Sequence, residues 1–183
     1  MHFTLTDLVT DITQNGAESG ATQVELEIRE SPGEFRFSVK DNGKGMTEEE
    51  MKRAQDPFIT DGIKHPHRKV GLGIPFLIQT AEQSGGGWDI QSQKGQGTMV
   101  SAWFDPGNVD TPPLGDIPGM FRTVLLFSGP GEFIIRRQRQ GAEGEELEYE
   151  VKKSELAAAL GDLEDTQSLI LLNQYLRSLE EDE

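Results

Sequence analysis

The stretch that decides the fold is VKDNGKGM, residues 39–46. Apolar residues alternate with polar ones over 35–39, which is typical of a strand with one buried face. Directly after the stretch, Thr47 and Glu50 have the spacing of a capping box, which marks the start of a helix. The Asn-Gly pair inside it is also a good hairpin turn, but no second strand follows it. The order strand, glycine loop, helix therefore predicts that Asp41 stands at a strand end beside a pocket.

Composition limits the classes of partner. The chain has 183 residues, with 17 basic against 32 acidic side chains and a net charge of −15. Duplex nucleic acid is bound through clustered basic residues, so this charge argues against nucleic-acid binding. Cysteine is absent, which excludes disulfides and thiolate metal sites, and no apolar run is long enough to span a membrane. We expect a cytoplasmic protein whose late acidic clusters form either a solvated face or a surface for a basic partner.

Helical and strand periodicities alternate along the first part of the chain. Because the strands come in pairs, we expect an α+β fold, a two-layer α/β sandwich with helices on one face of a sheet. The expected helices cover residues 5–19, 47–54 and 74–84, and the expected strands cover 21–30, 33–41, 88–93 and 98–104.

A segment rich in Pro, Gly and Asp, residues 106–119, predicts a linker between two parts of the chain. Residues 1–105 form the first predicted domain, and residues 120–183 form a small C-terminal domain in which strands precede helices. Its expected strands are 121–128, 131–140 and 146–153.

The last predicted helix carries a stripe of four leucines at helical spacing, Leu169, Leu172, Leu176 and Leu179. Such a stripe either docks a partner or a second copy of the chain as a homodimer, or packs onto its own subdomain. Both alternatives are open at this point.

Two acid and amide positions stand out. Asp11 and Asn15 are four residues apart on the first helix, so their side chains share a face. An amide oxygen at Asn15 can ligate magnesium, and a carboxylate one turn earlier can orient or deprotonate a water. The buried carboxylate predicted for Asp41 can accept a hydrogen bond from an exocyclic amine such as that of adenine.

Two further segments add glycines. In KVGLGIPFL, Gly71 and Gly73 lead into a helix, where backbone N–H groups suit phosphate oxygens. In GQGTMVSAW, Thr98 begins a strand after a glycine turn and can hydrogen-bond a base or a bound water.

Taken in order, these motifs give the chain a resemblance to the GHKL ATPases, the superfamily of gyrase, mismatch-repair ATPases, heat-shock chaperones and histidine kinases. The motifs are DITQNGAESGA, DNGKGM, DPFIT, GLGI and the strand pair GGGWDIQSQKGQGTMVSAWF, and the resemblance covers about residues 3–105. It implies a Bergerat-type ATP-binding fold that takes ATP and Mg²⁺.

The resemblance implies an ATP site formed by Asn15, Asp41, Gly43, Gly45, Met46, Phe58, Lys69, Gly71, Leu72, Gly73 and Thr98. In this site Asn15 ligates magnesium, and Asp41 binds the adenine amine with support from Thr98. Met46 and Phe58 line the pocket, and the glycines Gly43 and Gly45 let the purine lie against the backbone. Residues 60–70 form the lid over the triphosphate.

Two positions depart from the pattern. Asp11 stands where hydrolytic members carry Glu, and its shorter reach puts the activation of water in doubt. Lys69 stands where many kinases have Gly. It either places a positive charge near the γ-phosphate or is a solvated lid lysine.

A narrower resemblance is to small stand-alone bacterial ATP-binding proteins whose genes often lie beside those of iron-only hydrogenases. It rests on the early position of the N box and on the segment PPLGDIPG. It implies a hydrogenase-related protein partner.

The expected role of ATP has three forms. Two of the three histidines, His65 and His67, flank Pro66 and so do not sit on a helix, and we expect no phosphoacceptor histidine within this chain. The hypotheses are a protein kinase that acts on a partner, a slow ATPase that drives assembly of a partner complex, and a nucleotide-gated binding module without turnover.

Overall fold

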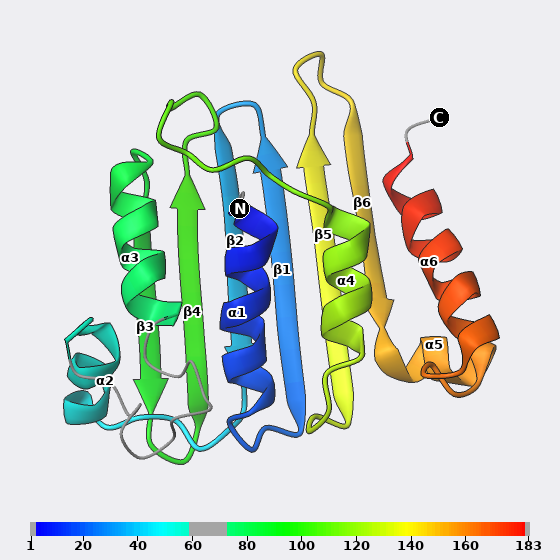
Figure 1. The fold of residues 1–183 in the computed structure, drawn as a ribbon, viewed down its shortest axis with the longest axis horizontal. Coiled ribbons are helices and arrows are strands. Elements are labelled where there is room, and N and C mark those ends of the chain that lie inside the picture. The colour runs from blue at the N-terminus through cyan, green and yellow to red at the C-terminus, as the bar shows by residue number, and fades with distance from the viewer. Residues whose placement is uncertain (1–2, 59–72, 182–183) are drawn as a thin grey trace.

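The computed structural model describes residues 3–58 and 73–181 of the chain. Its helices and strands are, in chain order, α1 (Leu5–Ala17), β1 (Gln23–Ser31), β2 (Glu34–Asp41), α2 (Glu48–Gln55), α3 (Gly73–Gln83), β3 (Gly87–Gln93), β4 (Gly97–Phe104), α4 (Ile117–Leu125), β5 (Glu132–Gln140), β6 (Glu146–Lys152), α5 (Lys153–Leu160) and α6 (Thr166–Glu180). The strands form one sheet in the order β3-β4-β2-β1-β5-β6, and α1, α3 and α4 lie over one of its faces (Figure 1). The predicted α+β class and two-layer sandwich are confirmed.

The register of the sheet brings polar residues of three strands together at one end. β2 and β4 are antiparallel neighbours, with Asp41 opposite Thr98. β3 and β4 are antiparallel as well, with Ser92 opposite Thr98. Asp41, Thr98 and Ser92 therefore lie in a row across the sheet.

The core lies between the sheet and the helices. Alternate residues of β1, among them Val24 and Leu26, are fully buried, as the period of two predicts. On the facing helix α1, Leu8, Val9 and Ile12 are buried at helical spacing. This packing fixes α1 over the middle of the sheet, so that its last turn ends beside the polar row.

The capping box predicted at the start of α2 is confirmed. The Glu50 N–H donates to the Thr47 hydroxyl at 3.1 Å, and the Thr47 N–H donates to the Glu50 carboxylate at 3.0 Å. None of the side chains of α2 is buried, so its position depends on these caps and on its contact with α3.

The strand predicted for residues 121–128 is wrong, because most of that segment belongs to helix α4. The Asp116 carboxylate caps this helix by accepting from the Gly119 N–H at 3.1 Å. The buried residues of α4 recur at helical spacing, as Ile117, Met120, Phe121, Val124 and Leu125. The helical spacing of these buried residues, rather than the run of apolar residues in the sequence, determines the secondary structure of this segment.

From β5 onward the predicted order of strands before helices is found, as β5, β6, α5 and α6. These strands do not form a sheet of their own, because β5 pairs in parallel with β1 over eight residues. The boundaries proposed around residues 106–119 stay predictions.

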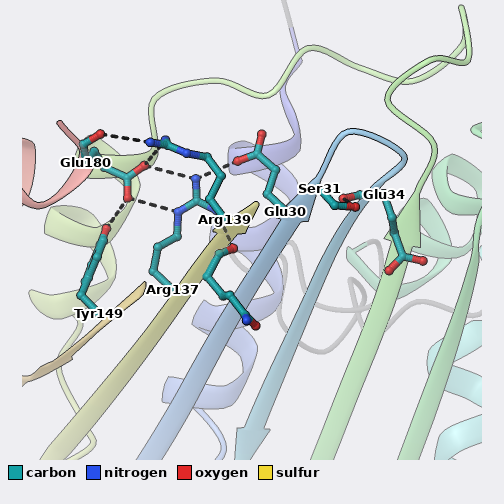
Figure 2. A network of polar contacts seen from close by, with 8 residues as sticks. Glu30, Ser31, Glu34, Arg137, Arg139, Tyr149 and Glu180 are labelled. Carbon is teal, nitrogen blue, oxygen red and sulfur yellow. Dashed lines mark hydrogen bonds and ion pairs between the residues drawn. The ribbon is translucent and has the colours of Figure 1, made fainter. Parts of the chain in front are cut away.

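A buried ionic network fastens the end of α6 to the sheet (Figure 2). The Arg137 guanidinium is only 1% exposed and donates to Glu30 at 2.7 Å and to Glu180 at 3.1 Å. The Tyr149 hydroxyl donates to the same Glu180 carboxylate at 2.5 Å. Burial and the neighbouring carboxylate raise the pKa of Tyr149, which keeps its phenol protonated as a donor. The network joins β1, β5, β6 and α6. It lies at one end of β1, and the pairing of Val24 with Asp41 lies at the other end of that strand.

The leucine stripe of α6 packs inward. Leu172 and Leu176 are fully buried, and Leu179 is half-buried against the core. For these three leucines, the structure therefore shows the alternative of packing onto the helix's own subdomain, where α6 contacts α4 and α5. Within residues 3–58 and 73–181, no helix has the length and apolar character needed to cross a membrane.

Candidate functional site: a cavity at the polar end of the sheet

A cavity of about 300 Å³ opens where the end of α1, the glycine loop after β2, α2, the start of α3 and β4 meet. Pockets for small molecules begin at about this volume. Its walls combine apolar side chains with a few polar groups, which is the usual composition of a site that orients a ligand.

Asp41 is the buried acid of this cavity. It is the last residue of β2, lines the cavity and is 8% exposed. Burial raises the pKa of its carboxyl, and hydrogen bonds from the Gly43 N–H, the Ser19 hydroxyl and the Thr98 N–H oppose that shift. The bond from Gly43 is 2.8 Å long. An acceptor held in this way is suited to a ligand that brings its own N–H donor.

The glycine loop is held between α1 and the β3–β4 turn. The Lys44 N–H donates to the Ser19 carbonyl at 3.0 Å, and the Gly95 N–H donates to the Lys44 carbonyl at 2.7 Å. A Cβ at Gly43 would lie 2.0 Å from Ser19 Oγ, and a Cβ at Gly45 would lie 2.0 Å from the Gln93 carbonyl oxygen.

These contacts revise the reason for the two glycines. The resemblance implied that they let a purine approach the backbone, but the chain itself fills the space where their side chains would be. Gly45 lines the cavity and has a φ of +66°, a conformation that favours glycine, whereas Gly43 is buried and does not line it.

Asn15 lies next to the start of α3. Its side chain lines the cavity from α1, and its Nδ2 atom is 3.5 Å from the place where a Cβ of Gly73 would be. Gly73 is the first residue of α3, where backbone N–H groups have no partner inside the helix. The structure thus brings the amide of the first motif and the helix start of the second glycine motif together.

Five of the predicted residues line the cavity, namely Asn15, Asp41, Gly45, Met46 and Thr98. Asp11, the predicted catalytic acid, is exposed on α1 and does not line it. Phe58, expected to line the pocket, is 93% exposed and does not line it. It lies in a turn that follows α2, where its N–H donates to the Asp56 carboxylate. Lys69, Gly71, Leu72 and the predicted lid lie outside the described residues.

The sequence reasoning missed the apolar walls. Val39 and Val100 line the cavity, each two residues from a polar member of the site on the same strand. Residues two apart on a strand share a face, so their positions could have been read from Asp41 and Thr98. Lys44 and Arg53 bring positive charge to the lining, Glu18 and Glu50 bring negative charge, and no signal in the sequence marked these four as site residues.

The oxygen ligands that the cavity offers suit magnesium only when phosphate oxygens supply the rest of its coordination. Among the described residues, no group of three or more His, Cys, Asp or Glu side chains could hold a metal ion. Magnesium binds proteins through one or two oxygen ligands and keeps substrate phosphates and water as the others. The single amide oxygen of Asn15 fits that mode.

Comparison with known proteins agrees with this geometry. The family described as histidine kinase-, DNA gyrase B-, and HSP90-like ATPase matches residues 3–108, more than half of the chain. The chain belongs to this ATPase family. The match contains every residue of the described cavity and confirms the resemblance read from the motifs.

Several relatives in this family are sensor kinases. The chain is 37% identical over 63 residues to sporulation kinase E of Bacillus subtilis and 28% identical over 86 residues to sensor histidine kinase ZraS of Escherichia coli. These matches cover 34% and 47% of this chain, but only 8% and 17% of the two relatives. The shared part is the ATPase domain found in histidine kinases, which supports ATP binding and a kinase-like function.

Proposed function

We propose that the chain binds Mg-ATP in the described cavity, with the adenine amine on Asp41. The observation that carries the proposal is a buried carboxylate at a strand end, next to Thr98, inside a cavity of nucleotide scale. The carboxylate already accepts from groups of its own chain, and a base that supplies an N–H group adds a further charge-assisted bond to this shielded acceptor.

The phosphates lie toward Asn15 and the first turn of α3 in this proposal. Asn15 supplies an oxygen ligand to magnesium, and the backbone N–H groups in the first turn of α3, which begins at Gly73, donate to phosphate oxygens. Bound magnesium would neutralise phosphate charge. Lys44 and Arg53 lie in the same lining and meet part of the phosphate charge, but Glu18 and Glu50 also line the cavity, so neutralisation of the phosphates depends mainly on magnesium.

We infer that the bound ATP serves a partner protein, either as the phosphate donor of a kinase or as the fuel of a slow ATPase. Support comes from the two relatives named above, both of which are kinases by name. A hydrogenase-related complex is the partner implied by the narrower resemblance. Its test is capture of such subunits by the ATP-loaded chain.

The second candidate is a nucleotide-gated binder without turnover. The observation that favours it is the position of Asp11, which is exposed and does not line the cavity. A general base must lie within hydrogen-bond reach of the water that it activates.

The experiment uses ATP labelled at the γ-phosphate, magnesium and the purified chain, with and without a lysate of the source cell. Free phosphate from the chain alone identifies an ATPase, and label on a lysate protein identifies a kinase. Bound but intact ATP identifies the binder. An Asp41→Asn variant run beside it separates activity of this chain from contaminating enzymes, and failure of the unaltered chain to bind ATP refutes the proposal.

A further inference from the structure

We propose that Ser92 is a positioning residue that sets the direction of the Thr98 hydroxyl, so that the base end of the cavity presents only hydrogen-bond acceptors. The consequence is selection of a base with an exocyclic amine over one with a carbonyl at that position. This inference rests on the proposed binding of a nucleotide in the cavity.

Ser92 lies behind the site rather than in it. It belongs to β3, stands opposite Thr98 and does not line the cavity, whereas Thr98 does. Three polar groups surround its hydroxyl. The Ser92 Oγ is 2.8 Å from the Thr98 Oγ1, 2.8 Å from the Met46 backbone nitrogen and 3.1 Å from the Gly97 carbonyl oxygen.

Only one arrangement of protons makes hydrogen bonds of all three contacts. A carbonyl oxygen only accepts, so the single Ser92 proton is donated to Gly97. A backbone N–H only donates, so Ser92 accepts from Met46. The remaining contact is then satisfied only when the Thr98 hydroxyl donates its proton to Ser92.

Thr98 therefore turns lone pairs toward the cavity. The neighbouring Asp41 carboxylate, when ionised, also accepts only. An exocyclic amine carries two N–H donors and meets both acceptors well. A carbonyl oxygen placed there meets lone pairs on both sides and is rejected, because its acceptor and theirs stay unpaired.

The same serine holds the glycine loop through the Met46 N–H, and loss of that bond would weaken binding of every nucleotide alike. The ratio of the affinities for two nucleotides that differ only in the base removes this shared effect. A positioning role through Thr98 changes the ratio, and a merely structural role does not.

The experiment measures dissociation constants for ATP and for inosine triphosphate, which carries a carbonyl in place of the adenine amine. The variants are Ser92→Ala, Ser92→Cys, whose sulfur is a weak acceptor, and Ser92→Thr, which restores a hydroxyl. Ser101→Ala, from the outward face of β4, is the matched control. Thermal melts establish that each variant is folded.

Freed from Ser92, the Thr98 hydroxyl can turn its proton toward the cavity. The ATP preference over inosine triphosphate should then fall about 2- to 12-fold in Ser92→Ala and in Ser92→Cys, the effect of one neutral hydrogen bond. It should be unchanged in Ser92→Thr and in Ser101→Ala. In a Thr98→Val background, Ser92→Ala should no longer change the preference.

Equal weakening of both nucleotides in Ser92→Ala and Ser92→Cys would overturn the inference, as would a change of preference that persists in the Thr98→Val background. Either result leaves the proposed function standing, because ATP is still bound. Absence of ATP binding by the unaltered chain would refute the proposed function and the role of Ser92 with it.

Discussion

Replacing Asp41 with asparagine tests the centre of the site with almost no change in volume. The carboxylate is buried and accepts from the Gly43 N–H at 2.8 Å through Oδ1, and also from the Ser19 hydroxyl and the Thr98 N–H, which leaves one of its roughly four lone-pair sites for a ligand. An asparagine has one oxygen, and that oxygen stays with the Gly43 N–H because the N–H is buried. Its amide NH₂ then faces the cavity and the adenine amine, donor against donor.

The expected effect follows from this reversal. A hydrogen bond to a charged group contributes about 1.5–3 kcal/mol, and leaving a buried donor unpaired costs about 1–3 kcal/mol. Partial relief by water reduces the sum, and we expect ATP binding to weaken by about 2–3 kcal/mol. This corresponds to about a 30- to 150-fold higher dissociation constant.

Isothermal titration with Mg-ATP measures the change, and a thermal melt without nucleotide measures folding. Asp89→Asn is the matched control, because Asp89 is an exposed carboxylate on β3 whose side chain faces away from the helices. A folded Asp41→Asn variant that binds ATP within a factor of two of the unaltered chain would refute the adenine assignment.

Three other predictions concern pH, the buried network and the glycine turn. Burial raises the pKa of Asp41 above its ordinary value of 3.8, and the amine binds the ionised carboxylate. ATP affinity should therefore be full above the raised pKa and fall as pH drops through it. Titration at several pH values should show a steeper fall in the unaltered chain than in Asp41→Asn, because protonation of ATP itself affects both equally. Arg137→Met should lower the free energy of unfolding by about 3 kcal/mol, since the half-buried Glu30 loses its ionic partner and Glu180 loses one of its partners. The exposed Arg29→Ala should lower it by at most about 1 kcal/mol in the same urea melt. Gly97→Ala should lower the free energy of unfolding by about 2 kcal/mol or more, because φ is +115° and the new Cβ would lie 2.0 Å from a backbone oxygen. Gly33→Ala, at a position with open space around it, should change this free energy by less than about 0.5 kcal/mol in the same assay.

Features that depend on nearby residues could be predicted from the sequence. The capping box of α2, the buried alternation of the β1–β2 hairpin and the position of Asp41 at a strand end all follow from patterns shorter than about ten residues. The meeting of Asn15 with Gly73 is different. It depends on the tertiary packing of two helices, and it could be anticipated only because the motifs together resemble a family with a known site.

Features set by distant contacts escaped the sequence. The parallel pairing of β5 with β1 joins segments about a hundred residues apart, and nothing local to residues 131–140 signals it. The error over residues 121–128 has a local cause. Phe121, Val124 and Leu125 were read as a strand-like apolar run, although they continue a helical period that begins at Ile117, behind the cap at Asp116.

The glycines of the loop are evidence about the backbone packing, whereas Asp41 beside them is evidence about the ligand. A Cβ at Gly43, Gly45 or Gly97 would collide with the chain's own atoms, so these residues are required for three backbone segments to meet, whatever the cavity binds. Their presence in the sequence therefore supports the shape of the loop and says little about a nucleotide contact. The case for the nucleotide rests on Asp41 and Thr98, because they place hydrogen-bond acceptors at the wall of a cavity, where a ligand with matching donors can pair with them.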